Sequence, residues 1–308
     1  MSTNSPLPGK DPYRLMEHMQ VDLPALVIQE HSLLELMGGP FPERNNNLHD
    51  FTRVLDIACG AGSWAMEIAR THPHLEVTGI TSQSALVDYA QKRADSAGLK
   101  NVRFLLVVGH EKPQLPFPEE EFDLVNTQYL HAWLRADEWQ EFAHECWRVS
   151  RPGGYIRMTE PERGQSTSAA FTRLEDLYLQ TLHRTGQRLS PDDRHIGAAT
   201  QLAYLCQETG WEKITRNAFV TDYGKAGEIP ENLLSRWQLY MQTFQPLILQ
   251  EGLASSEELT TLMQTVSEEI KREDFAANRF LITVCGQKPA KAETMKTLRS
   301  TRVNGAQH

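Results

Sequence analysis

The 308-residue sequence is poor in long hydrophobic runs. Its longest uninterrupted apolar run extends only from Phe104 to Val108, whereas a membrane-spanning helix needs about 20 apolar residues. The first residues, MSTNSPLPGK, also lack the apolar core of a secretory signal peptide. We therefore expect no insertion into a membrane and a cytoplasmic location.

Basic residues are scarce too. The chain has 31 lysines and arginines against 40 aspartates and glutamates, which gives a formal net charge of −9. Proteins that grip nucleic acid usually present a basic face to the phosphate backbone. The balance argues against nucleic acid as a partner, although a local basic patch would not show in it.

Paired cysteines are missing as well. The cysteines are Cys59, Cys146, Cys206 and Cys285, and no C-x-x-C motif is present. This spacing indicates neither a disulfide framework nor a zinc site and is typical of a reduced compartment. His72 and His74 flank Pro73 and could hold a metal ion, but a solvated turn is the simpler interpretation. No metal site is predicted.

What the sequence does have is a regular alternation of strand-like and helix-like segments over residues 52–162. The strand-like segments are RVLDIA, LEVTGI, NVRFLLVV, FDLVNTQ and YIRMTE. Before the last of them, apolar residues at positions 139, 142, 143, 146 and 147 have the spacing of a helix that packs on a sheet. Such alternation predicts βαβ units and an α/β fold with a doubly wound parallel sheet.

Ligands of such sheets bind at the carboxyl ends of the strands. The segments expected around this crevice are 58–62, 81–83, 109–111, 126–131 and 160–162. The first of them belongs to the stretch VLDIACGAGSW, in which a strand carrying Asp56 breaks at glycines and restarts as a helix. The pattern G-x-G-x-x-G/A is present as Gly60, Gly62 and Ala65, but alone it is weak evidence for a dinucleotide.

Asp56 distinguishes between the candidate ligands of this turn. A nicotinamide or flavin dinucleotide would place its pyrophosphate on the helix N-terminus, where a nearby carboxylate is unfavourable. That class also needs an acid near position 80, where Thr81 stands. S-adenosylmethionine carries a sulfonium and an ammonium group and no phosphate, so a buried Asp56 would be its counter-charge. The alternative is a structural aspartate that caps its own turn.

Several motifs then resemble one family in register. VLDIACGAGSWAMEIA resembles motif I of the class I S-adenosylmethionine-dependent methyltransferases. LPFPEEEFDLVNTQYLHAW and HECWRVSRPGGYIRMTEPE are similar to that family's L-P-F-x-x-x-x-F-D-x-V and E-x-x-R-V-L-x-P-G-G segments, and TGWEKI and RFLITVCGQK to its last two strands. The resemblance covers about half of the chain. It implies a Rossmann-like methyltransferase sheet with an antiparallel last strand, and S-adenosylmethionine as cofactor, converted to S-adenosylhomocysteine.

The resemblance also implies, by position, which residues bind the cofactor. They are Asp56, Ala58, Gly60 and Gly62 along the methionine and ribose, Thr81, Ser82 and Gln83 after the second strand, His110 and Glu111 at the adenine, and Asn126. Thr81 departs from the family, because most relatives have an acid there for the ribose hydroxyls. A similar G-I-T-x-S occurs in relatives resembling tocopherol and cyclopropane-forming enzymes, which leaves Gln83 as a candidate for the ribose.

Methyl transfer from a sulfonium is an in-line displacement, so positioning the acceptor about 3 Å from the methyl group supplies much of the acceleration. A base is needed only when the acceptor must lose a proton. His131 and Glu160 are the candidate catalytic residues, with a core or helix-capping histidine and a solvated loop acid as the alternatives. Tyr13, Tyr129 and Glu162 are expected at the substrate pocket.

The acceptor class is only partly indicated. Residues 126–129, NTQY, occupy the place of the N/D-P-P-Y tetrad of methyltransferases that act on amino groups in nucleic acid, but both prolines are missing. We expect a methyltransferase of a small organic molecule, in specialised metabolism, with O- or N-methylation as the default. C-methylation of a prenyl, lipid or quinone-like acceptor is the alternative. Rivals from other classes are an NAD-dependent oxidoreductase and a non-catalytic cofactor-binding regulator.

The sequence predicts seven successive parts. They are an N-terminal helical lid (1–50), the S-adenosylmethionine-binding core (51–162), a helical cap segment (163–197), a core helix and strand (198–224), a helical insertion of the cap (225–275), the last core strand (276–288) and a disordered tail (289–308). A helical N-terminal arm can exchange between subunits, so a homodimer is compatible with this organisation.

Overall fold

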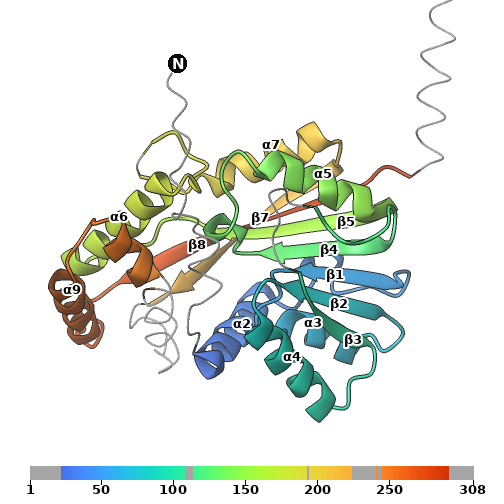
Figure 1. Cartoon of the computed structure of the whole chain (residues 1–308), viewed down its shortest axis with the longest axis horizontal. Coiled ribbons are helices and arrows are strands. Elements are labelled where there is room, and N and C mark those ends of the chain that lie inside the picture. The colour runs from blue at the N-terminus through green and yellow to red at the C-terminus, as the bar shows by residue number, and fades with distance from the viewer. Residues whose placement is uncertain (1–21, 108–113, 193, 224–240, 242–243, 291–308) are drawn as a thin grey trace, which may run out of the picture.

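The computed structural model of the chain describes residues 22–107, 114–192, 194–223, 241 and 244–290 (Figure 1). At its centre lies an eight-stranded sheet. The strands are β1 (Arg53–Ile57), β2 (Glu76–Thr81), β3 (Val102–Leu106), β4 (Phe122–Gln128), β5 (Ser150–Pro161), β6 (Gln165–Ser166), β7 (Glu212–Asp222) and β8 (Ala277–Gln287). They follow the order β3-β2-β1-β4-β5-β8-β6, and β7 pairs with β8.

The strand directions are those of a doubly wound sheet with a reversed last strand. Neighbours from β3 to β5 run parallel, whereas β8 runs antiparallel to both β5 and β7. The register places Asp56 of β1 between Gly79 of β2 and Asn126 of β4. The expected α/β, Rossmann-like fold with an antiparallel last strand is confirmed.

Helices connect and cover these strands. They are α2 (Leu23–Met37), α3 (Ser63–Thr71), α4 (Ser84–Ser96), α5 (Trp139–Val149), α6 (Ala169–Arg184), α7 (Ala198–Thr209) and α9 (Ser256–Glu269), with 3-10 turns η1 (Pro42–Arg44) and η2 (Leu130–Ala132). Helix α2 begins where the Asp22 side chain accepts a hydrogen bond from the Ala25 backbone nitrogen at 3.1 Å. It ends at Gly38, whose φ of 79° is left-handed.

The alternation of side chains along each strand builds one apolar core on each face. On β1, Val54 belongs to the buried cluster that contains residues of α3 and α4, whereas Leu55 and Ile57 belong to the cluster that contains residues of α5 and α7. Figure 1 shows the same division, with α2, α3 and α4 on one side of the sheet and α5 and α7 on the other. Because β1 is covered on both faces, Asp56 lies in a buried layer.

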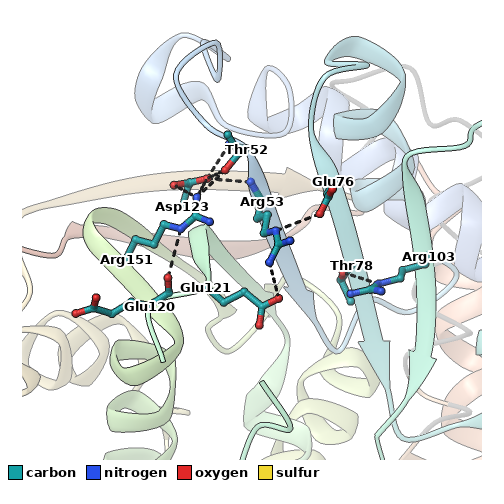
Figure 2. Close-up of polar contacts among 9 residues, drawn as sticks. All are labelled: Thr52, Arg53, Glu76, Thr78, Arg103, Glu120, Glu121, Asp123 and Arg151. Atoms are coloured by element: carbon teal, nitrogen blue, oxygen red, sulfur yellow. Dashed lines mark hydrogen bonds and ion pairs between the residues drawn. The ribbon is translucent and has the colours of Figure 1, made fainter. Parts of the chain in front are cut away.

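Polar contacts fix the edge of the sheet at which β1 and β4 begin (Figure 2). Asp123 Oδ2 accepts hydrogen bonds from the backbone nitrogens of Thr52 at 2.7 Å and Arg53 at 2.9 Å. Arg151 Nη1 lies 3.0 Å from the same oxygen, and Arg53 Nε lies 3.1 Å from Glu76 of β2. These contacts hold the strand ends together on the side away from the expected ligand crevice.

The turn between α3 and β2 is less exposed than the sequence suggests. His72 is 7% exposed, and its Nδ1 lies 2.9 Å from Thr71 Oγ1. The interpretation of a solvated turn is therefore wrong for His72. Among the described residues, no group of three or more His, Cys, Asp or Glu side chains is arranged to hold a metal ion.

The expected division into seven parts stays a prediction. Helices α6 and α9 contact each other beyond the sheet, and residues 244–250 are also helical. Much of the predicted lid, insertion and tail lies outside the described residues. Within the part of the chain that the structure describes, no helix is long and apolar enough to cross a bilayer.

Candidate donor-binding and catalytic site

The turn after β1, residues 58–62, is called the glycine turn here. Ala58, Gly60 and Gly62 all take left-handed φ values of 55°, 57° and 85°. A Cβ atom on Gly62 would lie 2.6 Å from the Phe104 ring, so this glycine is needed for packing between α3, α4 and β3. A Cβ atom on Gly60 would instead collide with the carboxylate of Glu30. The backbones of both glycines stay predicted cofactor contacts.

Asp56 precedes the glycine turn and is 3% exposed. The pKa of Asp56 is raised to about 8, mainly by burial and also by the nearby Glu30 carboxylate, while a hydrogen bond from Asn126 and the charge of Arg157 oppose the shift. That bond joins Asn126 Nδ2 to Asp56 Oδ1 at 2.8 Å. Asp56 therefore bonds to the neighbouring strand, which disfavours the alternative of an aspartate that caps its own turn.

A buried polar chain holds Asn126 in one orientation. Arg157 of β5 donates from Nη1 to Asn126 Oδ1 at 3.1 Å and from Nε to Glu43 Oε2 at 3.1 Å. Because a guanidinium only donates, the Asn126 oxygen must face Arg157 and its amide hydrogens must face Asp56. Arg157 is fully buried. Sequence reasoning missed this residue, although a charged side chain inside an apolar strand is the same signal that Asp56 gave.

Glu30 of α2 is a second residue that sequence reasoning missed. Its Oε1 accepts from the Ala61 backbone nitrogen at 2.7 Å, and its Oε2 accepts from the Ser63 backbone nitrogen at 3.1 Å. Arg93 of α4 donates to the Ala61 carbonyl at 2.6 Å. Burial raises the pKa of Glu30, and its hydrogen bonds to Ala61 and Ser63 and the charge of Arg93 partly oppose this. No local pattern in the sequence connects Glu30 with a turn about 30 residues downstream.

The predicted ribose contacts lie at the end of β2 and directly after it. Thr81 and Gln83 are each 8% exposed, and the Gln83 backbone nitrogen donates to Thr81 Oγ1 at 3.4 Å. Ser82 lies between them and is partly exposed. His110, Glu111 and the pocket candidate Tyr13 lie outside the described residues.

His131 and Glu160 meet at the ends of β4 and β5. His131 Nδ1 lies 2.6 Å from Glu160 Oε2, and the Leu130 backbone nitrogen donates to Glu160 Oε1 at 2.7 Å. The opposite ring nitrogen, His131 Nε2, lies 2.5 Å from the hydroxyl of Tyr178 on α6. Glu160 is fully buried, so the alternative of a solvated loop acid is wrong. Tyr178 is a third residue that sequence reasoning missed.

The other two pocket candidates have structural partners. Both carboxylate oxygens of Glu162 accept backbone hydrogen bonds at the start of α7, including the Ala199 nitrogen at 3.0 Å. Tyr129 has a left-handed φ of 58° and packs against the small buried cluster of Leu33 and Met37. Their assignment to a substrate pocket stays a prediction.

Residues 54–154 match the family model described as a methyltransferase domain. This segment is a methyltransferase domain. The family resemblance expected from the motifs is thereby confirmed for the part of the chain that contains the glycine turn, Asn126 and His131. Glu30, Glu160 and Tyr178 lie outside the methyltransferase domain in sequence and join it in space.

Curated relatives are similar to a part of the chain. The chain is 36% identical to a fatty-acid O-methyltransferase of Mycolicibacterium smegmatis over 131 residues. The aligned residues are 42% of this chain and 44% of the relative. The chain is 32% identical over 130 residues to a demethylmenaquinone methyltransferase of Thermotoga maritima (42% and 52%), and 29% over 138 residues to one of Geobacillus kaustophilus (44% and 56%). The chain thus spans about half the length of these relatives.

Proposed function

We propose that the chain is an S-adenosylmethionine-dependent methyltransferase of a small organic acceptor, with O- or N-methylation as the default. The observation that carries this proposal is the buried Asp56 beneath the glycine turn of a methyltransferase domain. Burial disfavours the ionised form of Asp56, so a cationic ligand stabilises its carboxylate, whereas a phosphate would raise its pKa further.

The residues at this edge of the sheet fit the donor. Asp56 would face the positive amino-acid end, and the backbone of the glycine turn would approach the methionine. Thr81, Ser82 and Gln83 would hold the ribose. S-adenosylmethionine supplies an activated methyl group on a positively charged sulfur, and the protein orients the acceptor against it.

We assign the base role to His131, with Glu160 as the group that orients it. An ionised Glu160 only accepts, so it fixes the Nδ1–H tautomer of His131 and leaves Nε2 as the acceptor of a proton. When a hydroxyl acceptor attacks the methyl carbon, the carbon–sulfur bond breaks and the hydroxyl proton passes to Nε2. Tyr178 occupies Nε2 in the structure, so we expect the acceptor to compete with Tyr178 for that nitrogen or to lose its proton through the Tyr178 hydroxyl.

The relatives suggest which acceptors to try first. One is named a fatty-acid O-methyltransferase, which agrees with O-methylation of a lipid-like acid. Others are named demethylmenaquinone methyltransferases, which keeps a quinone-like acceptor as the second candidate. We propose a cytoplasmic location, which the four free cysteines support, and no nucleic-acid acceptor.

The test is incubation of the full chain with methyl-labelled donor and a panel of fatty acids, phenols, amines and reduced quinones. We expect labelled product with at least one class. His131→Gln should lower kcat about 100-fold or more, with the dissociation constant of the donor unchanged. The His144→Gln variant, on an exposed position of α5, is the matched control. Unchanged turnover of His131→Gln and Glu160→Gln would rule out the base role, and tight NADH binding without donor binding would rule out the function.

A further inference from the structure

Two carboxylates approach the glycine turn from different elements. Asp56 lies at the end of β1, and Glu30 reaches the turn from α2, outside the methyltransferase domain. Glu30 accepts hydrogen bonds from the Ala61 and Ser63 nitrogens, a few residues after Asp56, and its charge raises the pKa of Asp56. Burial raises the pKa of both carboxyl groups, and a cation bound between them would stabilise their ionised forms.

Glu30 is held in place by the turn itself. Its two oxygens take hydrogen bonds from the Ala61 and Ser63 nitrogens, at the start of α3. The left-handed Gly60 leaves the space into which the carboxylate fits. The Ala61 nitrogen, the Ser63 nitrogen and the Ser63 side chain bond to Glu30, and the four lone pairs of its two oxygens leave room for one further donor.

Helix α2 is anchored so that Glu30 stays at this position. Leu33 and Met37 are buried, and Trp64 of α3 donates from Nε1 to the Pro40 carbonyl at 2.8 Å. A ligand that bonds to Glu30 in place would leave these contacts unchanged.

We propose that Glu30 is a donor-binding residue that acts with Asp56 to bind the α-ammonium group of the donor's amino-acid end. This inference rests on the proposed function. Helix α2 would then complete the donor site from outside the methyltransferase domain, and selectivity would favour ligands that carry an amino-acid moiety over simple nucleosides.

The test compares three ligands by equilibrium dialysis at about pH 7.5, where free α-amino groups are still largely protonated. S-adenosylmethionine and S-adenosylhomocysteine carry the α-ammonium, whereas 5′-methylthioadenosine lacks the whole amino-acid end. Glu30→Gln keeps an oxygen for the Ala61 nitrogen but removes the charge. Glu35→Gln removes the same charge from an exposed position of the same helix and is the matched control. Circular dichroism establishes that each variant is folded.

We expect Glu30→Gln to bind the two amino-acid ligands about tenfold more weakly than the wild type, because a charge-assisted hydrogen bond is lost. Binding of 5′-methylthioadenosine should change less than twofold, and Glu35→Gln should match the wild type for all three ligands. The conservative Glu30→Asp should lose less affinity than Glu30→Gln.

Other results would overturn the inference. Tighter binding of the amino-acid ligands by Glu30→Gln would mean that Glu30 competes with the donor's carboxylate for the turn. Equal loss for all three ligands, or unfolding of both Glu30 variants, would mean that Glu30 only holds α2. Wild-type affinity of Glu30→Gln refutes this role alone, whereas a wild-type protein that binds none of the ligands refutes the proposed function as well.

Discussion

Asp56 should couple donor binding to the release of a proton. With a pKa of about 8, its carboxyl group is mostly protonated at pH 7 in the free protein. A cation beside it favours the ionised form and lowers that pKa. Binding should therefore release a proton, and the affinity for the donor should rise as the pH rises toward 8.

We predict that the affinity for S-adenosylmethionine increases up to about tenfold per pH unit between about pH 6 and 7.5. At higher pH the donor's own α-ammonium loses its proton, and the gain in affinity should end. Calorimetry at each pH in two buffers of different ionisation enthalpy measures both the affinity and the released proton. Asp56→Asn should abolish the pH slope and bind most weakly relative to wild type at the upper end of this range. A pH-independent wild-type affinity would contradict the role of Asp56.

Gly62 should be irreplaceable for steric reasons. Gly62 has a left-handed φ of 85°, and a Cβ atom on it would lie 2.6 Å from the Phe104 ring. We predict that Gly62→Ala lowers the free energy of unfolding by about 2–5 kcal/mol, through overpacking and left-handed strain together. Gly98 also has a left-handed φ, of 72°, but a Cβ atom on it would meet nothing within 4 Å. Gly98→Ala should therefore cost only about 1–2 kcal/mol in the same urea titration, and equal losses would show that strain alone acts.

The junction of β4, β5 and the segment after α2 depends on a buried ion pair. Arg157 and Glu43 are 0% and 4% exposed. We predict that Arg157→Met lowers the free energy of unfolding by about 3–5 kcal/mol, because it leaves Glu43 buried without its counter-charge. The double variant Arg157→Met/Glu43→Met should regain most of that loss. If the double variant is as unstable as the single one, packing and not charge explains the cost.

Local patterns predict most of these elements because their signals are short-range. The core helix and strand predicted within residues 198–224 are observed as α7 and β7. The strand expected at YIRMTE begins earlier, at Ser150, because Ser150 pairs with Phe122 of β4 despite the intervening Pro-Gly-Gly. Pairing between distant strands overrides the turn signal there.

The candidate site shows the same difference between short-range and long-range signals. Asp56, Asn126, His131 and Glu160 stand at strand ends that the alternation already brings to one edge. Glu30 and Tyr178 arrive from helices that pack over this edge, and no spacing in the sequence encodes those contacts. Long-range packing, which sequence periodicity does not report, therefore supplied the residues that sequence reasoning missed.

Across the whole molecule, the two ends of the parallel strands in the central sheet have different roles. One end is fixed by the contacts of Asp123, Arg53 and Arg151 (Figure 2). The opposite end gathers the glycine turn, the buried acids and the His131–Glu160 pair. Helices α6 and α9 lie beyond β8 (Figure 1). The family model matches residues 54–154, and we expect the acceptor to be selected by the rest of the chain.

The most direct test of the central claim is calorimetric titration of the full chain with S-adenosylmethionine and, in parallel, with NADH. We predict saturable binding of S-adenosylmethionine at one site per chain and no binding heat with NADH. Saturable binding of NADH with none of S-adenosylmethionine would show that the buried acid beneath the glycine turn does not select a cationic donor.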